Sequence, residues 1–165
     1  MYRRILLVLA PLLILSGTAG GEFVNKKDTL KGISKFYVII EDFDEKAKEN
    51  GLSVDILLTN TELALRMAGI EVVSNDDPKR FAFPYLYVHA SVFIHSHEPN
   101  LFAYSLNIQF KQVVTLINGN ITIATTWDTS TIGFGGIDTI RNLPDDVKRD
   151  VDIFLNDYLA VNPKK

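Results

Sequence analysis

The sequence predicts an α+β fold, in which a mainly antiparallel sheet of about five strands carries two helices packed on one face. Its predicted chain order is β-α-β-β-β-β-α. Residues 101–117 alternate between apolar and polar side chains with a period of two, as in a long strand with one buried face. Asn118-Gly119, a pair typical of tight hairpins, follows directly. Segments 53–68 and 142–161 have the apolar spacing of helices.

The N-terminal residues 1–19 are typical of a secretory signal peptide. A positively charged start precedes an apolar run of eleven residues, and Gly17 and Ala19 are the small residues that a signal peptidase requires. The run is too short for a membrane span, which needs about 20 residues. Residues 20–34 are polar and contain glycine, so we expect a flexible leader there.

The first half of the domain is predicted to hold a strand, a helix and a short strand. Residues 35–43 are β-branched and aromatic, which favours a strand, and a charged turn or short helix follows. Ser53 is the expected N-cap of a helix that stops at Gly69. This helix is apolar over most of its circumference, which predicts burial on several sides by the sheet and second helix, or by a partner protein. Residues 70–74 form the short strand.

The second half is predicted to be three strands joined by hairpins, followed by a helix. In the first hairpin, even positions of the strand that ends at Ile94 are predicted to pair with even positions of the next strand, for example Ile94 with Phe102. A two-residue type I′ turn at Asn118-Gly119 sets the second register. Its predicted pairs are Ile117 with Asn120, Leu116 with Ile121, Val114 with Ile123 and Phe110 with Trp127. A glycine-bearing loop at 133–136 and the last helix complete a single domain at 35–163.

Two helices cover one face of the sheet, so the other face is predicted to be uncovered. The candidate binding residues on this face are Tyr87 beside Gln109 and Asp128, and His89 beside Asn107, with Phe134 next to the face in the glycine loop. A solvated sheet face is normally polar, which explains most of these residues. Aromatic rings, an imidazole and amides on one surface could also bind a partner or a polar ligand.

The three histidines raise the question of a metal site. His89 lies roughly 20 Å along a strand from His95, at about 3.4 Å per residue, so these side chains cannot share one metal. His95, His97 and Glu98 remain together in the hairpin turn. We interpret them as exposed side chains of a turn, because no fixed third ligand completes the set. No metal is assigned.

Composition excludes several classes of function. Removing Arg3 and Arg4 with the signal changes the formal net charge from −3 to −5. An acidic protein without a basic run is a poor candidate for nucleic acid or for stable attachment to the membrane. The absence of cysteine excludes disulfides and a thiol nucleophile, and in an exported domain it favours a bacterial source. No nucleophile-elbow, phosphate-loop or H-E-x-x-H motif is present, so neither a catalytic constellation nor a cofactor is expected.

Several segments carry a family resemblance over nearly the whole mature chain. They are ELALRMAGI (62–70), PYLYVHASV (84–92), FAYSLNIQFKQVV (102–114), TTWDTSTIGFGG (125–136) and VDIFLNDYLAVNP (151–163). The chain resembles a family of small exported bacterial proteins of unknown function, and the resemblance implies no catalytic residues. The order of elements is similar to that of the N-terminal domain of the periplasmic protein TolB, which is a likeness of architecture.

These observations favour a non-enzymatic exported protein of the bacterial periplasm. We expect an interaction or envelope-assembly accessory module that binds a protein partner in the cell envelope through the uncovered sheet face or a sheet edge. The alternative is a small-ligand binding protein that uses the same face, which would require a concave pocket. A metal-dependent hydrolase at His95 and His97 is the third hypothesis.

Overall fold

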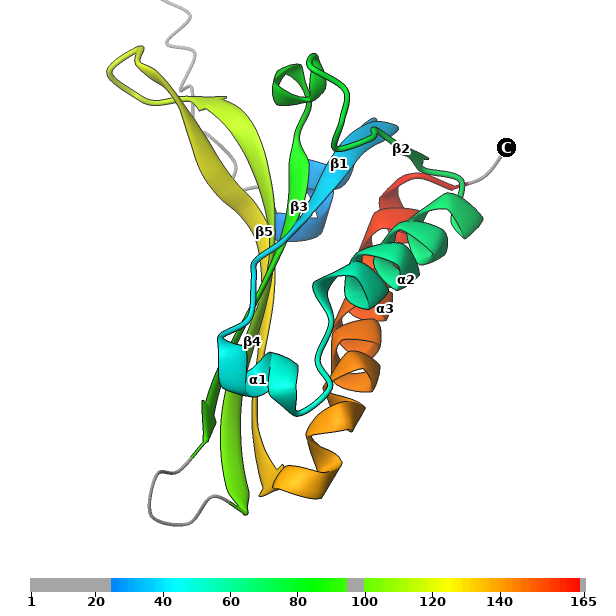
Figure 1. The fold of residues 1–165 in the computed structure, drawn as a ribbon. Coiled ribbons are helices and arrows are strands. Elements are labelled where there is room, and N and C mark those ends of the chain that lie inside the picture. The colour runs from blue at the N-terminus through cyan, green and yellow to red at the C-terminus, as the bar shows by residue number, and fades with distance from the viewer. Residues whose placement is uncertain (1–24, 95–99, 164–165) are drawn as a thin grey trace, which may run out of the picture.

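The computed structural model describes residues 25–94 and 100–163. It consists of one layer of sheet and one layer of helices (Figure 1). The strands are β1 (Lys35–Ile40), β2 (Glu71–Val72), β3 (Tyr85–Ile94), β4 (Leu101–Thr115) and β5 (Ile121–Gly136). The α-helices are α1 (Glu45–Glu49), α2 (Val54–Met67) and α3 (Leu143–Val161), and the 3-10 helices are η1 (Lys26–Leu30), η2 (Arg80–Ala82) and η3 (Ile137–Asn142).

The sheet is mixed but mainly antiparallel, with the strand order β2-β1-β3-β4-β5. β1 pairs in parallel with both neighbours, through two residue pairs with β2 and four with β3. β3 and β4 pair antiparallel over ten residue pairs, and β4 and β5 over fifteen. Helices α2 and α3 lie against the same side of this sheet (Figure 1). The predicted α+β class and the predicted order of strands and long helices are therefore confirmed.

The helix ends follow the predicted capping residues. Ser53 accepts a hydrogen bond from the Ile56 amide at 3.4 Å, which satisfies one of the free donors at the start of α2. Gly69, just beyond the end of α2, has a φ of 91°, a conformation that glycine adopts without steric cost. Pro144 lies in the first turn of α3, where its missing N–H leaves no bond unmade.

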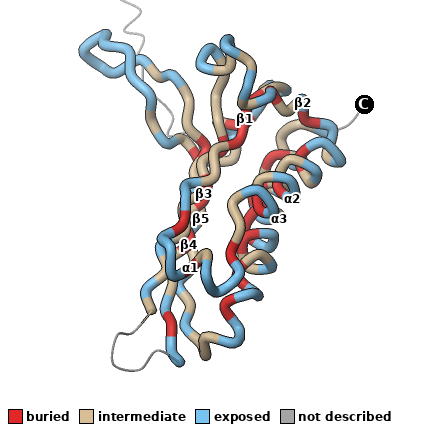
Figure 2. Tube along the Cα trace, viewed as in Figure 1, coloured by how far each residue is buried: buried red, intermediate tan, exposed pale blue. Residues whose placement is uncertain are grey.

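An aromatic cluster forms the core between the sheet and α3. Phe154 of α3 is fully buried, and its ring centroid lies 5.1 Å from that of Trp127 and 5.6 Å from that of Phe110. The Trp127 indole donates a hydrogen bond to the Asp157 carboxylate at 2.8 Å. Buried segments line the surfaces where the sheet and the helices meet (Figure 2). The predicted pairing of Phe110 with Trp127 in the core is confirmed.

The turn of the second hairpin differs from the prediction. A type I′ turn needs positive φ at both central residues, whereas among the described residues only glycines have positive φ, and Gly119 is one of them. The Leu116 amide donates to the Asn120 carbonyl, so the loop has three residues, 117–119. The predicted pairs Ile117–Asn120, Leu116–Ile121 and Val114–Ile123 are therefore wrong, and the observed pairs are Thr115–Ile121, Val114–Thr122 and Val113–Ile123.

A β-bulge restores the predicted register nearer the core. Lys111 pairs with Thr125 and Phe110 with Trp127, so Thr126 is an extra residue on β5. Gln112 donates a hydrogen bond to the Thr126 hydroxyl at 2.6 Å, which supports the bulge. The loop takes one extra residue from the β4 side and the bulge adds one residue on the β5 side, so the two shifts cancel. From Phe110 onward the predicted register holds, and Trp127 lies on the buried face.

Residues 133–136, predicted to be a loop, are the end of β5. Gly133 lies opposite Tyr104 of β4, and a Cβ at this position would lie 2.3 Å from the Tyr104 Cε1 atom. The Tyr104 ring therefore occupies the space that a side chain at 133 would need, and its hydroxyl donates to Asp146 of α3. Phe134 consequently projects from a strand and not from a flexible loop.

Residues 26–34, which were expected to belong to a flexible leader, pack against the domain. Leu30, at the end of η1, is fully buried in the core. The Lys26 ammonium donates to the Asp128 carbonyl at 2.7 Å, and the Thr29 hydroxyl to the Thr126 carbonyl at 3.2 Å. η1 therefore covers part of the outer edge of β5.

Helix α2 is buried on only part of its circumference. Leu57 and Leu65 are buried, whereas Ile56, Leu63 and Met67 are each more than half exposed. The prediction that this chain alone buries the helix on several sides is therefore wrong for the outward stripe. The structure of the chain leaves that stripe open to solvent.

Candidate functional site

The face of the sheet opposite α2 and α3, here called the open face, carries four rows of side chains across β3, β4 and β5. Residues that are directly opposite on neighbouring strands project to the same side of a sheet. The rows are Tyr87–Gln109–Asp128, His89–Asn107–Ser130, Ser91–Ser105–Ile132 and Phe93–Ala103–Phe134. The predicted arrangement of Tyr87, Gln109 and Asp128, and of His89 and Asn107, is confirmed. Phe134 joins Phe93 at the end of the face.

Glu41 completes the site and was not among the residues predicted from the sequence. It follows β1, which runs parallel to β3, and its amide donates to the Val88 carbonyl at 2.9 Å. This pairing places Glu41 beside His89. The Glu41 Oε2 atom accepts a hydrogen bond from the Tyr87 hydroxyl and lies 2.5 Å from the His89 Nδ1 atom.

A continuous hydrogen-bonded chain leads from Glu41 across the face. The other ring nitrogen of His89, Nε2, lies 2.8 Å from the Ser91 hydroxyl oxygen. His89 and Ser91 are two residues apart on one strand, so both project from the same side. The order of groups is therefore carboxylate, imidazole and hydroxyl.

The polar residues surround a shallow hollow of about 310 Å³, lined by Glu41, Tyr87, His89, Asn107 and Gln109. The ring planes of Tyr87 and His89 are nearly parallel, with centroids 6.3 Å apart. The Lys111 ammonium lies 4.8 Å from the centroid of the Tyr87 ring, within the range of a cation–π contact. The hollow, here called the polar hollow, therefore offers hydrogen-bond acceptors and donors to a ligand.

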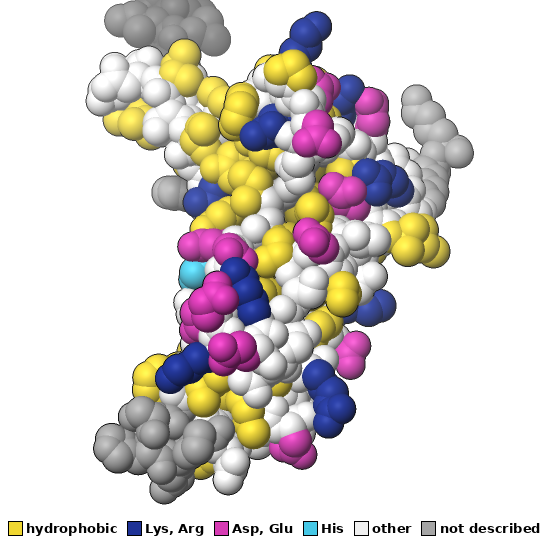
Figure 3. Space-filling model, in the orientation of Figure 1, with side chains coloured by type: hydrophobic (Ala, Val, Ile, Leu, Met, Phe, Trp, Pro, Cys, Tyr) yellow, Lys and Arg dark blue, Asp and Glu magenta, His cyan; other side chains and the backbone are white. Residues whose placement is uncertain are grey.

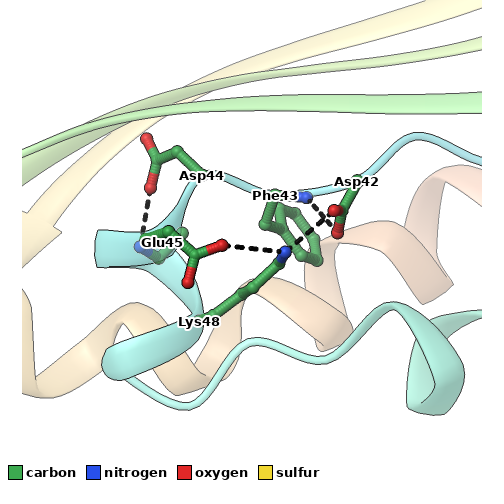
Figure 4. A network of polar contacts seen from close by, with 6 residues as sticks. Asp42, Phe43, Asp44, Glu45 and Lys48 are labelled. Carbon is green, nitrogen blue, oxygen red and sulfur yellow. Dashed lines mark hydrogen bonds and ion pairs between the residues drawn. The ribbon is translucent and has the colours of Figure 1, made fainter.

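The turn after Glu41 is held by charged side chains (Figure 4). Lys48 of α1 contacts Asp42 at 2.8 Å and Glu45 at 3.3 Å. The hydrogen bond from Lys48 lowers the pKa of the Asp42 carboxyl, and the same bond raises the pKa of Lys48. Asp44 accepts from the Ala47 amide at 2.7 Å and caps α1. These contacts fix the path of the chain directly beyond Glu41.

Large apolar side chains are exposed at one end of the open face. Phe93, Ile132 and Phe134 are 65%, 83% and 88% exposed. In the register, Ala103 lies between the two phenylalanines, so the side chain between them in this row is only a methyl group. These three residues are called the apolar end below.

The hairpin of β4 and β5 projects from the other end of the sheet and is also apolar. Figure 3 shows hydrophobic side chains over it, at the upper left of the view. Ile117, Ile121, Ile123 and Val113 are exposed there. The corrected register explains this exposure, because it pairs Val113 with Ile123 on the side continuous with the open face.

The other sequence-based sites fall outside these features. His95, His97 and Glu98 lie outside the described residues, as does the signal segment 1–19. In the described ranges 25–94 and 100–163, no group of three or more His, Cys, Asp and Glu side chains could hold a metal ion. No helix in these ranges is long and apolar enough to cross a membrane. Asp128 is exposed beside the hollow, and its carbonyl accepts from Lys26.

Comparisons with known proteins leave the family open. No family model matches the chain, and no curated protein matches it. Among solved structures, the chain is similar to the rare lipoprotein B from Shewanella oneidensis, with a TM-score of 0.25 and 12% sequence identity over 78% of this chain and 88% of that chain. A likeness at this level carries no argument about function.

Proposed function

We propose that the protein is an exported bacterial envelope protein that binds another protein through the apolar end of its open face. The observation that carries the proposal is the joint exposure of Phe93 on β3 and of Ile132 and Phe134 on β5, the two strands on either side of β4. An exposed apolar patch on a protein surface is typical of an interaction site, and a few such residues carry most of the binding energy of an interface.

Export to the periplasm is part of the same proposal. It rests on the charged start, the apolar run and the small residues of segment 1–19, together with the absence of cysteine. The similarity to the TolB N-terminal domain is consistent with a role as an accessory in envelope assembly. This accessory role is a prediction that rests on the order of helices and strands in the sequence.

The test uses a photoreactive benzoylphenylalanine in the exported chain in place of Phe134, with the same residue in place of Ile117 as the matched control. Both positions are exposed and apolar but lie at opposite ends of the sheet. Irradiation of cells should produce a protein adduct from position 134 and none from 117. Ile132→Glu should abolish the adduct, because it places a charge within the apolar end.

Three outcomes would contradict the proposal. One is the absence of any adduct from position 134 in a folded, exported chain. Another is equal crosslinking from positions 134 and 117, and the third is an adduct that Ile132→Glu leaves unchanged.

The polar hollow supports a second candidate function, the binding of a small polar ligand. The hollow has a volume of about 310 Å³ and is lined by converging polar groups. A flat face without such a hollow would not favour the binding of a small ligand. A thermal-shift screen with polar metabolites would test it, with His89→Ala as the variant that should lose any shift. A shift that survives in His89→Ala would place the ligand elsewhere.

A further inference from the structure

The chain of hydrogen bonds from Glu41 through His89 to Ser91 has the connectivity of an acid–histidine–serine triad. We propose that Ser91 is a nucleophile that accepts acyl groups from esters, with His89 as its general base and Glu41 as the residue that positions the imidazole. The inference does not depend on the proposed protein partner. The proposed reaction takes place on the polar rows of the open face, and the apolar end serves only to select the acyl group.

The connections run between the atoms that this chemistry requires. An ionised carboxylate only accepts hydrogen bonds, so the Glu41 Oε2 atom at 2.5 Å from Nδ1 favours, for a neutral imidazole, the tautomer with its proton on Nδ1. Nε2 is then left with a lone pair and lies 2.8 Å from the Ser91 oxygen, within reach of the hydroxyl proton. The Tyr87 hydroxyl also donates to Glu41, which restrains the carboxylate.

Two paired strands hold the three residues. Glu41 is joined to β3 through its own backbone amide, and the Asp42–Lys48 contact fixes the chain that follows it. His89 and Ser91 lie within β3 and pair with residues of β4. Sites built on regular elements keep their side-chain geometry better than sites on loops.

The reaction balances with water as the second substrate. The Ser91 oxygen bonds to the ester carbonyl carbon while its proton passes to the His89 Nε2 atom. The tetrahedral intermediate collapses, the bond to the alcohol oxygen breaks, and His89 returns the proton to that oxygen. Water then attacks the acyl group on Ser91 with His89 again taking the proton, and an acid is released as the serine is restored.

The neighbouring rows indicate the substrate class. Asn107 lies directly opposite His89, and its amide, which donates to Ser105 at 3.2 Å, has a second hydrogen for a developing oxyanion. Ile132 lies on the Ser91 row and the apolar end follows. We therefore expect esters of short apolar acids. The side chains of His89 and Glu41 are 34% and 44% exposed, so water competes for their hydrogen bonds and only esters with good leaving groups should react readily.

The experiment combines labelling by a fluorophosphonate with hydrolysis of p-nitrophenyl butyrate by the purified exported domain. Peptide mapping should locate the phosphonate on Ser91. Ser91→Ala should abolish both signals, and His89→Ala should lower hydrolysis about a hundredfold, as expected for the loss of a general base. Ser130→Ala is the matched control, because Ser130 is an exposed serine on the same face of β5 and has no contact with His89 or Ser91 among those the structure shows.

The positioning role of Glu41 has its own readout. Glu41→Gln should change the pH at which hydrolysis reaches half its maximum, whereas Ser130→Ala should leave that pH unchanged. All of these substitutions are on the open face, and circular dichroism would verify that each variant is folded. The proposal is overturned if the folded wild-type protein takes no label, if the label maps away from Ser91, or if Ser91→Ala hydrolyses the ester at the wild-type rate.

Discussion

Replacement of Gly133 by alanine should destabilise the fold through one cross-strand neighbour. The added Cβ would lie 2.3, 2.4 and 2.5 Å from the Cε1, Cζ and hydroxyl oxygen atoms of Tyr104. These distances are far below a van der Waals contact, so the ring must move. Its hydroxyl bonds to Asp146 of α3, and any movement of the ring therefore strains that hydrogen bond.

The expected magnitude follows from these contacts. Overpacking a well-filled site costs about 1–3 kcal/mol, and Gly133→Ala should lower the free energy of unfolding by that amount. In a Tyr104→Ala background the clash is gone, and glycine to alanine within a strand should stabilise by about 0.5–1 kcal/mol. The two substitutions should therefore couple by roughly 1.5–4 kcal/mol.

Urea denaturation of the four chains of this double-mutant cycle measures the coupling. Trp127 is the only tryptophan and is fully buried, so its fluorescence reports unfolding in every chain. A cost of Gly133→Ala that is the same in both backgrounds would refute the reasoning. So would a Gly133→Ala protein as stable as the wild type.

Two further predictions concern the buried ring of Phe154 and the hydroxyl of Tyr104. Phe154→Ala should lower the free energy of unfolding by about 3–5 kcal/mol in urea, because this ring is fully buried among aromatic neighbours; a loss below about 1 kcal/mol would contradict this packing. Burial and the Asp146 hydrogen bond raise the pKa of Tyr104 from 10.0 to about 12. A group whose folded pKa is raised stabilises fully below its unfolded pKa, so stability should fall as pH rises from about 10 to about 12. Urea midpoints over that range should fall less steeply in Tyr104→Phe, and equal slopes would exclude Tyr104 as a contributor.

Much of the fold was predictable because the signals that determine it are local. Alternation in β4 identified a long strand with one buried face, and Ser53 and Gly69 bounded α2 through their own backbone chemistry. The first hairpin register followed from matching apolar positions, and the structure confirms the pairing of Ile94 with Phe102. These features depend on residues close together in sequence.

The rest depended on contacts that are distant in sequence. The position of β1 between β2 and β3 arises from parallel pairing across long connections, so the sequence did not indicate that Glu41 lies beside His89. Gly119 alone adopts positive φ in a three-residue loop, although Asn118-Gly119 suits a two-residue turn equally well. Gly133 suits its position in β5 because the Tyr104 ring fills the space that a side chain would need. The glycines of residues 133–136 therefore do not mark a loop, and the sequence alone does not show this contact.

The packing of η1 against β5 affects how far the N-terminal side of the domain can be shortened without causing aggregation. β5 is the last strand of the sheet, and Lys26 and Thr29 occupy carbonyl acceptors on its outer edge. Unpaired edges recruit strands from other molecules. A shortened chain that begins at Ser34 would lose Leu30 from the core and expose these acceptors, and it would be prone to aggregate through edge-to-edge association. The segment before the first strand therefore protects the edge of β5 from pairing with strands of other molecules.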